Sequence, residues 1–318
     1  MKKLALLLAA LSVASVSYAK EVMPEAAPVV EEAPVVEEVV EVKAAPVLRV
    51  TSVGQELVVE DTSSQGTKND ANIGEAVHLK NMVGLALGDS WTFDLMARKT
   101  WEASTDDAHT DGEKWDGMRS AGHRIDLQAT RHFENFSLGL RWRGEKNKDA
   151  IFLPVSYNYG MVSGWFDPAY YFVNESKGQD YFYLEAEPVV LSYGPVQLAY
   201  YFEGYKWTGE GDGNAPTDTK SDYAHQARLR GTVYSNDAFS VGLEYRYQFA
   251  QDVEMVNGNK DVENNRHIGV LSGSYNVTEN LTLAGYYQYE FNKYEQHEGD
   301  VMDDDYYGEF GLGWTYNF

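Results

Sequence analysis

The sequence predicts a transmembrane antiparallel up-and-down β-barrel, an all-β fold, preceded by a leader and a disordered linker. Three observations predict it. From residue 48 onward, apolar and polar side chains alternate with the period of two that a β-strand requires. The chain carries 23 Tyr, 13 Phe and 7 Trp although its mean hydropathy is only −0.45. Such amphipathic rings are typical of a surface that lies between lipid and water. Finally, short and long polar connections alternate along the chain, as between turns at one rim and loops at the other.

Composition excludes several classes of function. Of the 318 residues, 49 are acidic and 26 basic, which gives a formal net charge of −23 and argues against a nucleic-acid partner. The chain has no cysteine, so disulfides, thiolate zinc sites, iron–sulfur clusters and cysteine nucleophiles are excluded. We expect no cofactor and no metal site.

The first 47 residues predict export. Residues 1–19 combine a basic start, a short apolar run and Ala19 at a small-residue cleavage position, which is typical of a signal peptide. Residues 20–47 are rich in Pro, Val and Glu, with the repeat APVVEE beginning at Ala27 and again at Ala33. This composition predicts a disordered periplasmic linker, either a plain spacer or a tether to the cell wall or a partner. The barrel is expected over 48–318.

The last segment shows the strand pattern most clearly. Phe310, Leu312, Trp314 and Tyr316 share one parity, and small or polar residues occupy the other. The same reasoning predicts 14 strands, with 12 as an alternative because the first, seventh and eighth are weakly patterned. We expect strands near 48–60, 77–87, 91–101, 122–132, 136–144, 150–160, 166–174, 181–191, 196–207, 223–234, 239–249, 265–276, 281–292 and 306–318.

The connections between these strands predict two different rims. Tight turns are expected at 88–90, 133–135, 161–164, 192–195, 235–238 and 277–280. Longer polar stretches lie at 102–121, 208–222, 250–264 and 294–305, and short and long connections are expected to alternate strictly.

The polar face of the strands decides between a membrane barrel and a soluble sheet. A soluble sandwich or lipocalin-like barrel would bury the aromatic face and expose the other. Here the opposite face carries charged side chains at mid-strand, and burying them in a dry interior would be very unfavourable. Lipid outside and water inside removes the conflict, so we expect a bacterial outer-membrane protein in contact with lipid and lipopolysaccharide.

Charged residues of the inward parity are the candidate pore lining. With 14 strands the wall lies about 14 Å from the axis, which leaves a bore on the order of 1 nm for small hydrophilic solutes and ions. Opposite charges across the bore would create a transverse field, whereas charges paired on neighbouring strands would only brace the wall; either gives a modest ion preference. The candidates are Arg98, Arg124, Arg141, Arg143, Arg228, Arg230, Arg246, Arg266, Glu185, Glu187, Glu203, Glu244, Glu290 and Glu309.

Several segments carry a resemblance to a known family. They include RVTSVGQEL from Arg49, the stretch 91–99, GHRID from Gly122, SLGLRWR from Ser137 and YGMVSG from Tyr159. Together they resemble the FomA-like major outer-membrane porins of fusobacteria. The resemblance implies a diffusion channel, a 14-strand barrel, a homotrimer and loops that contact other bacterial or host surfaces. The terminal Phe318 is similar to the signal that hands barrels to their assembly machinery.

Two other functions stay open. The protein would be an adhesin if its long loops bind partner cells and the barrel is only their scaffold. A hydrolase would need a constellation such as Ser120, His123 and Asp126, with His109 nearby. His123 and Asp126 have opposite parity and cannot pair directly, so an enzyme is disfavoured. The acidic loops near 106–116 and 295–305 fit no calcium-loop template, which favours a solvated rim.

Overall fold

The computed structural model describes residues 46–63, 71–102, 118–174, 178–208, 219–256, 263–295 and 305–318. The expected signal peptide and nearly all of the linker lie outside these residues. In the part of the chain that the structure describes, no helix is long and apolar enough to span a membrane.

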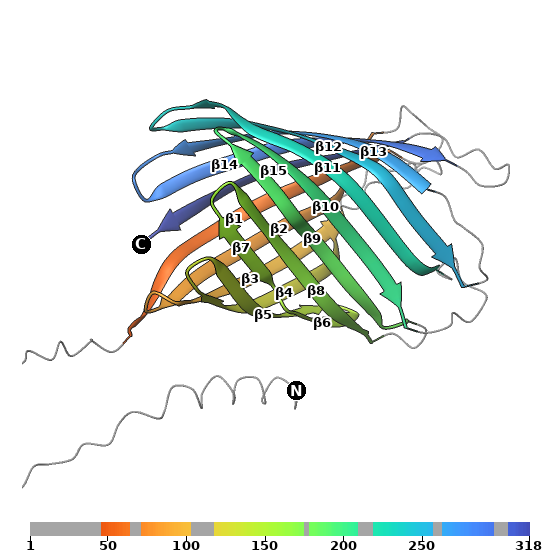
Figure 1. Ribbon diagram of the computed structural model, residues 1–318, viewed down its shortest axis with the longest axis horizontal. Coiled ribbons are helices and arrows are strands. Elements are labelled where there is room, and N and C mark those ends of the chain that lie inside the picture. Colours follow the sequence, from red (N-terminus) through yellow and green to blue (C-terminus); the bar gives the residue numbers. More distant parts are fainter. Residues whose placement is uncertain are drawn as a thin grey trace, which may run out of the picture. The chain divides into compact units, whose positions relative to one another are not determined.

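One antiparallel sheet makes up the described chain, and it closes on itself because its first strand pairs with its last (Figure 1). Its strands are β1 (Leu48–Ser63), β2 (Ala71–Leu87), β3 (Trp91–Glu102), β4 (Arg119–His132), β5 (Phe136–Glu145), β6 (Lys148–Phe152), β7 (Val155–Tyr159), β8 (Val162–Val173), β9 (Tyr181–Tyr193), β10 (Val196–Trp207), β11 (Thr219–Ser235), β12 (Phe239–Met255), β13 (Glu263–Asn276), β14 (Leu281–Glu295) and β15 (Asp305–Asn317).

Fifteen elements form a 14-strand barrel because β6 and β7 share one position in the sheet. Both pair with β5 on one side and with β8 on the other. The interruption falls at Leu153–Pro154, where Pro154 has no backbone N–H to donate. The carbonyl of Pro154 still accepts from the amide of Gly139 at 2.7 Å, so the sheet continues across the break. The prediction of 14 strands is confirmed, and the alternative of 12 is wrong.

Strand ends differ from the predictions mainly at the rim of the long connections. There β2, β11 and β12 extend to Ala71, Thr219 and Met255, several residues past the predicted ends. Backbone pairing continues there although neither face shows an apolar alternation, because sheet hydrogen bonds do not depend on lipid contact.

The predicted connections are largely right, with two corrections. The turn expected at 161–164 is formed by Gly160 and Met161, with Gly160 at a φ of 77°, a conformation that glycine adopts without strain. Val162 already belongs to β8. The strict alternation of short and long connections is also wrong, since only Lys146 and Asn147 join β5 to β6.

The two faces of the sheet have opposite chemistry. Leu271 and Leu312 are 52% and 53% exposed on the outer face, and Tyr287 is 49% exposed. The side chains of Arg141 and Arg246, of the opposite parity, are only 16% and 23% exposed. A closed barrel wrapped in exposed apolar side chains needs lipid around it. The predicted orientation, with the apolar face outward, is therefore confirmed.

Candidate functional site: the inner face of the barrel

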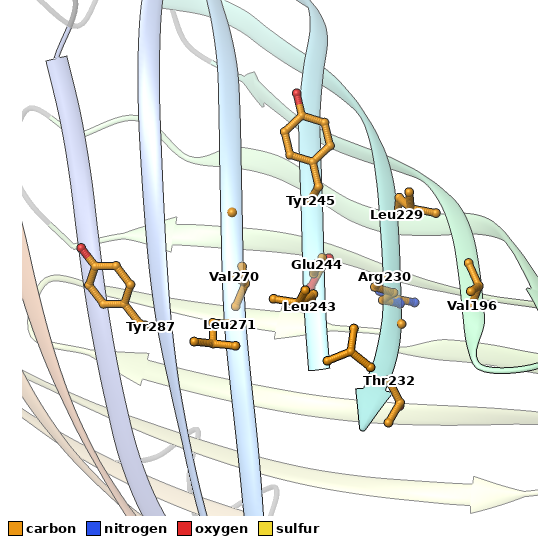
Figure 2. A pocket seen from close by; sticks show the side chains of 13 residues that line it. Val196, Leu229, Arg230, Thr232, Leu243, Glu244, Tyr245, Val270, Leu271 and Tyr287 are labelled. Atoms are coloured by element: carbon orange, nitrogen blue, oxygen red, sulfur yellow. The ribbon is translucent and has the colours of Figure 1, made fainter. Parts of the chain in front are cut away.

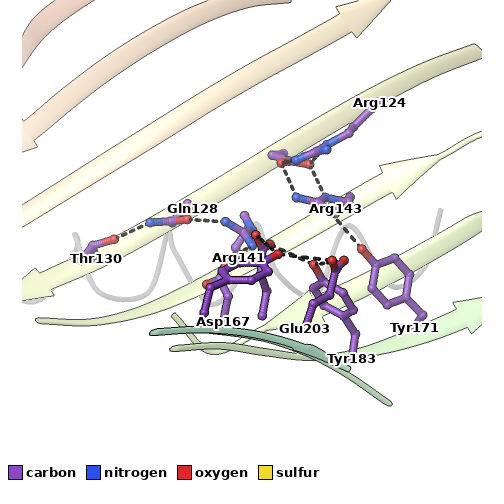
Figure 3. Close-up of polar contacts among 12 residues, drawn as sticks. Arg124, Gln128, Thr130, Arg141, Arg143, Asp167, Tyr171, Tyr183 and Glu203 are labelled. Atoms are coloured by element: carbon purple, nitrogen blue, oxygen red, sulfur yellow. Dashed lines mark hydrogen bonds and ion pairs between the residues drawn. The ribbon is translucent and has the colours of Figure 1, made fainter. Parts of the chain in front are cut away.

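Strand parity places all of the predicted lining residues on the inner face, where most of them form ion pairs or hydrogen bonds with neighbouring side chains. The paired members form separate clusters, each within a few strands. Figure 3 shows the contacts of one stretch of this wall.

The first cluster, named the Asp126 cluster, contains Arg124, Asp126 and Arg143. Asp126 on β4 lies directly opposite Arg143 on β5 in the strand register. Its carboxylate accepts from Arg143 Nε at 3.1 Å and from Arg124 Nε at 2.9 Å (Figure 3). One carboxylate thus holds two guanidinium groups, and charge-assisted bonds of this kind are stronger than neutral ones. The cluster carries a net positive charge.

Arg141 continues this basic patch along β5. It pairs with Asp167 on β8 and donates to Gln128 Oε1 at 3.4 Å. The guanidinium carbons of Arg141 and Arg143 lie 4.0 and 4.5 Å from the ring centroid of Phe152. Phe152 is only 1% exposed, so the two arginines cover an aromatic ring on the inner wall, a cation–π arrangement.

The second cluster, named the Glu187 cluster, contains Glu187, Arg228 and Arg230. Glu187 Oε1 lies 3.1 Å from Arg228 Nη1, and Glu187 Oε2 lies 2.8 Å from Arg230 Nη2. Glu187 is on β9 and both arginines are on β11, so the pairs reach across β10.

Small and flat side chains on β10 make this reach possible. Ala199 is opposite Arg228 in the register and is 3% exposed, so no long side chain stands between the partners. Tyr201, two residues on, presents its ring 3.4 Å from the guanidinium carbon of Arg228. A register shift between Tyr200 and Phe202 marks the β9–β10 bulge beside Glu187.

Two of the remaining basic residues, Arg246 and Arg266, pair with glutamates over short distances. Arg246 Nε lies 2.9 Å from Glu244 Oε1 on its own strand, and Arg266 Nε lies 3.3 Å from Glu290 Oε1 on the next strand. Arg98 lies on β3, opposite Arg124 in the register. Locally paired charges favour the hypothesis that they brace the wall.

The order of the strands adds a second argument against one transverse field. In the closed ring, β3–β5 lie about half-way round from β11–β13, so the two groups of arginines face each other. Glu185 and Glu203 on β9 and β10 similarly face Glu56 and Glu60 on β1. Opposite signs therefore alternate around the ring and do not divide it into two halves.

Sequence reasoning missed two groups on this face. One comprises the acidic partners Asp126 and Asp167, whose inward parity was readable from the strand pattern. The other is a group of aromatic side chains on the inner wall. Most of them share the parity of Glu185 and Glu203, but the aromatic-rich face of the strands was predicted to be the one that contacts lipid. The inner aromatics of β6 and β8–β10 include Phe152, Trp165, Tyr171, Tyr181, Tyr183, Tyr201, Tyr205 and Trp207.

The residues considered for catalysis do not come together. His123 is exposed, whereas Asp126 is buried on the opposite face between two arginines. Ser120 accepts a hydrogen bond from Lys99. His109 lies outside the described residues, as do most of the acidic loop residues.

Two hollows lie on opposite sides of the β10–β14 region. A cavity of about 670 Å³ lies against the inner wall, where Gln197, Glu244, Arg246 and Gln288 line it. A groove of about 530 Å³ has an apolar rim on the outer face, which Figure 2 shows with Leu229, Leu243, Leu271, Tyr245 and Tyr287. Charged and amide side chains share the lining of the inner hollow with apolar ones, whereas the outer hollow is mostly apolar.

No family model and no curated protein matches the chain. Several solved structures are similar in fold. An in-vitro folded OmpT, an outer membrane protein of Vibrio cholerae, is 12% identical with a TM-score of 0.43, over 85% of this chain and 98% of that one. An anion-selective porin from Comamonas acidovorans is 12% identical with a TM-score of 0.43, over 86% and 100%. Acinetobacter baumannii OccAB3 is 8% identical with a TM-score of 0.46, over 85% and 99%.

Likenesses of this size say nothing of solute or chemistry, so the barrel's own geometry carries the conclusion. It is closed and antiparallel, apolar outside and polar inside. The protein is an outer-membrane β-barrel.

Proposed function

We propose that the protein is a porin that lets small hydrophilic solutes and ions diffuse passively across the outer membrane, as its resemblance to the FomA-like porins implies. The observation that carries the proposal is the charged and polar inner face of a closed 14-strand barrel. A barrel of this strand number leaves an aqueous bore on the order of 1 nm. We further propose that the predicted arginines and glutamates line that bore.

Local pairing supports a weak ion preference. Each carboxylate of the two clusters is shared by two arginines, but other stretches of the wall are acidic. Neither sign dominates the bore, so we expect a channel that conducts both cations and anions, with modest selectivity.

A polar contact on the outer face supports a homotrimer. Gln55 Nε2 donates to Asn81 Oδ1 at 2.8 Å, and both residues are exposed. Amides facing hydrocarbon are unfavourable, whereas they are readily satisfied against another protein. We propose that β1 and β2 contact a neighbouring subunit. Chemical crosslinking of vesicles should give trimers, and Gln55→Leu with Asn81→Leu should weaken them.

The C-terminal residue supports the proposed partnership with the assembly machinery. Phe318 is 68% exposed and its amide donates to the carbonyl of Thr51 at 3.0 Å. Its ring contacts Tyr316 edge-on but stays largely exposed to a partner, while its backbone is fixed. We expect deletion of Phe318 to reduce the amount of protein that reaches the outer membrane.

The deciding experiment is single-channel recording. Residues 20–318 are refolded, their β-structure is confirmed by circular dichroism, and they are inserted into planar bilayers in potassium chloride. We expect stepwise conductance that rises with salt concentration. A correctly folded protein that inserts into vesicles but passes no current would overturn the proposal.

Two neighbouring substitutions test which face lines the bore. Leu271→Arg places a charge in the lipid near the middle of β13, and we expect a loss of stability of about 2–4 kcal/mol. Ser272→Arg, one residue later on the inner face, should leave folding intact. It should shift the reversal potential toward the equilibrium potential of the anion. Urea unfolding in vesicles and reversal potentials measure the two effects; equal tolerance of both arginines would contradict the orientation.

A further inference from the structure

The inner aromatics of β8–β10 form a continuous group that we name the aromatic shelf: Tyr171, Tyr181, Tyr183, Tyr205 and Trp207. Neighbouring rings are in contact along the whole group. The centroids of Tyr171 and Tyr181 are 4.5 Å apart with planes at 14°. Those of Tyr183 and Tyr205 are 4.9 Å apart, and those of Tyr205 and Trp207 are 5.7 Å apart with planes at 19°. Tyr181 joins the two ends, 5.8 Å from Trp207.

The shelf has a buried back and an accessible front. Tyr171 and Tyr181 are only 6% and 8% exposed and pack with Phe152. Tyr183, Tyr205 and Trp207 pack against this back and are partly exposed. The nearly parallel rings of Tyr205 and Trp207 therefore present a flat apolar patch on a wall that is otherwise polar.

Hydrogen bonds fix the edges of the front rings. Tyr183 donates to Glu185 Oε2 at 2.9 Å, and Tyr205 donates to Glu203 Oε1 at 2.7 Å. Tyr201 donates to both carboxylates from the adjacent position, at 3.0 and 3.3 Å. With their hydroxyls held at the wall, the rings lose rotational freedom before any ligand arrives, which favours binding.

The charged groups beside the shelf already have partners. Lys148 lies over Tyr171 and Tyr181, 5.2 and 5.8 Å from the ring centroids, and it contacts Glu145 at 3.5 Å. Arg143 donates to the hydroxyl of Tyr171 at 2.9 Å while it holds Asp126. The back of the shelf therefore already carries a cation, and the adjacent carboxylates accept from tyrosine hydroxyls while keeping lone pairs for a further donor. These conditions favour a neutral ligand over an organic cation.

We infer that the aromatic shelf binds the ring of a neutral saccharide on its way through the bore. A pyranose ring has a face of C–H groups, which packs on aromatic rings, and a rim of hydroxyls, which needs hydrogen-bond partners. Tyr205 and Trp207 supply the flat surface, and the oxygens of Glu203 and Glu185 lie beside it as acceptors. This inference rests on the proposed function, because it concerns a solute inside the same channel.

The test is block of the ionic current by maltohexaose, with a second measurement that does not need conduction. We expect maltohexaose to reduce the single-channel current of the wild-type protein in a concentration-dependent manner. Tyr205→Ala with Trp207→Ala should raise the half-blocking concentration at least tenfold, whereas Trp207→Phe should retain block. Tyr307→Ala is the matched control, because Tyr307 is an inner-face tyrosine of β15 that also bonds a glutamate, Glu309, at 2.7 Å.

The second measurement is quenching of tryptophan fluorescence by maltohexaose in detergent-folded protein. We expect Trp207→Phe to reduce this quenching, because Trp207 is the tryptophan of the shelf. Normal conductance without block or quenching would overturn the saccharide inference and leave the porin proposal standing. Quenching of the fluorescence without any conductance would support saccharide binding and overturn the porin proposal. Block by tetraethylammonium but not by maltohexaose, or block unchanged in the double variant, would also overturn the inference.

Discussion

The Asp126 cluster and the Glu187 cluster have the same composition, one carboxylate and two arginines, but they are built differently. Asp126 and Arg143 lie opposite each other on adjacent strands, so the backbone register alone brings them together. Glu187 meets its arginines across an intervening strand, which requires the small Ala199 and the bulge beside it. The Glu187 side chain is 2% exposed and that of Asp126 is 11% exposed.

This difference shows that the two partners of a charge pair in a barrel wall can be brought together either by strand register or by side-chain packing. A pair set by register survives changes in its surroundings. A pair set by packing is more deeply buried and depends on what the intervening strand leaves empty, so the Glu187 cluster should be the more sensitive of the two.

The largest expected effect is that of Glu187→Gln. Removing this charge leaves the mostly buried Arg228 and the half-buried Arg230 without their anion, and we expect a loss of about 3 kcal/mol in the free energy of unfolding. The reversal potential should also move toward the anion. Urea unfolding in vesicles measures the first effect. Glu254→Gln is the control, because its pair with Lys220 is exposed and should change stability by less than about 1 kcal/mol.

Ala199→Leu tests the dependence on packing directly. The larger side chain would occupy the space over which Glu187 and Arg228 meet, so we expect a loss of about 2 kcal/mol without any change of charge. Ala227→Leu, on the outer face of β11, adds the same volume toward lipid and should be neutral. If both substitutions were equally tolerated, the role of Ala199 would be disproved.

Asp126→Asn should have a smaller effect of the same sign. An amide oxygen can still accept from the arginines in either variant, but the site of Asp126 is more open to water than that of Glu187, so we expect a loss of about 1–2 kcal/mol. Because both neutralisations add one positive charge to the wall, their shifts of the reversal potential should be similar. A loss of stability larger than that of Glu187→Gln would reverse the comparison.

The smallest effect is expected at the turn beside β8. Gly160→Ala meets no atom within 4 Å but must adopt a φ of 77°, which costs an alanine about 1 kcal/mol. Gly269→Ala on β13 also meets no atom within 4 Å and has no positive φ, so it should change stability much less. The turn makes no contact with either cluster, and neither variant should alter selectivity.

Sequence reasoning recovered the strands and their faces because the contrast between lipid and water imposes a period of two. It failed at the ends of β2, β11 and β12 beside the long connections, where the apolar alternation of the sequence disappears. It recovered the parity of Glu187 and Arg228 but not their pairing across β10, because a contact over two strands depends on the side chain of the strand between them. It missed the aromatic shelf because the sequence does not distinguish a tyrosine facing lipid from one facing the bore by residue type alone.

The seam between β1 and β15 has a consequence for how the chain becomes a barrel. The two strands that close it are the first and the last of the described sheet, and their register runs from Ser52 opposite Asn317 to Thr62 opposite Tyr307. The final strand emerges last from export, so the cylinder stays open until then, with two bare edges able to pair with foreign strands. Pairing of β1 with β15 is thus the last step of barrel assembly. A chain truncated before residue 305 would keep both strand edges unpaired.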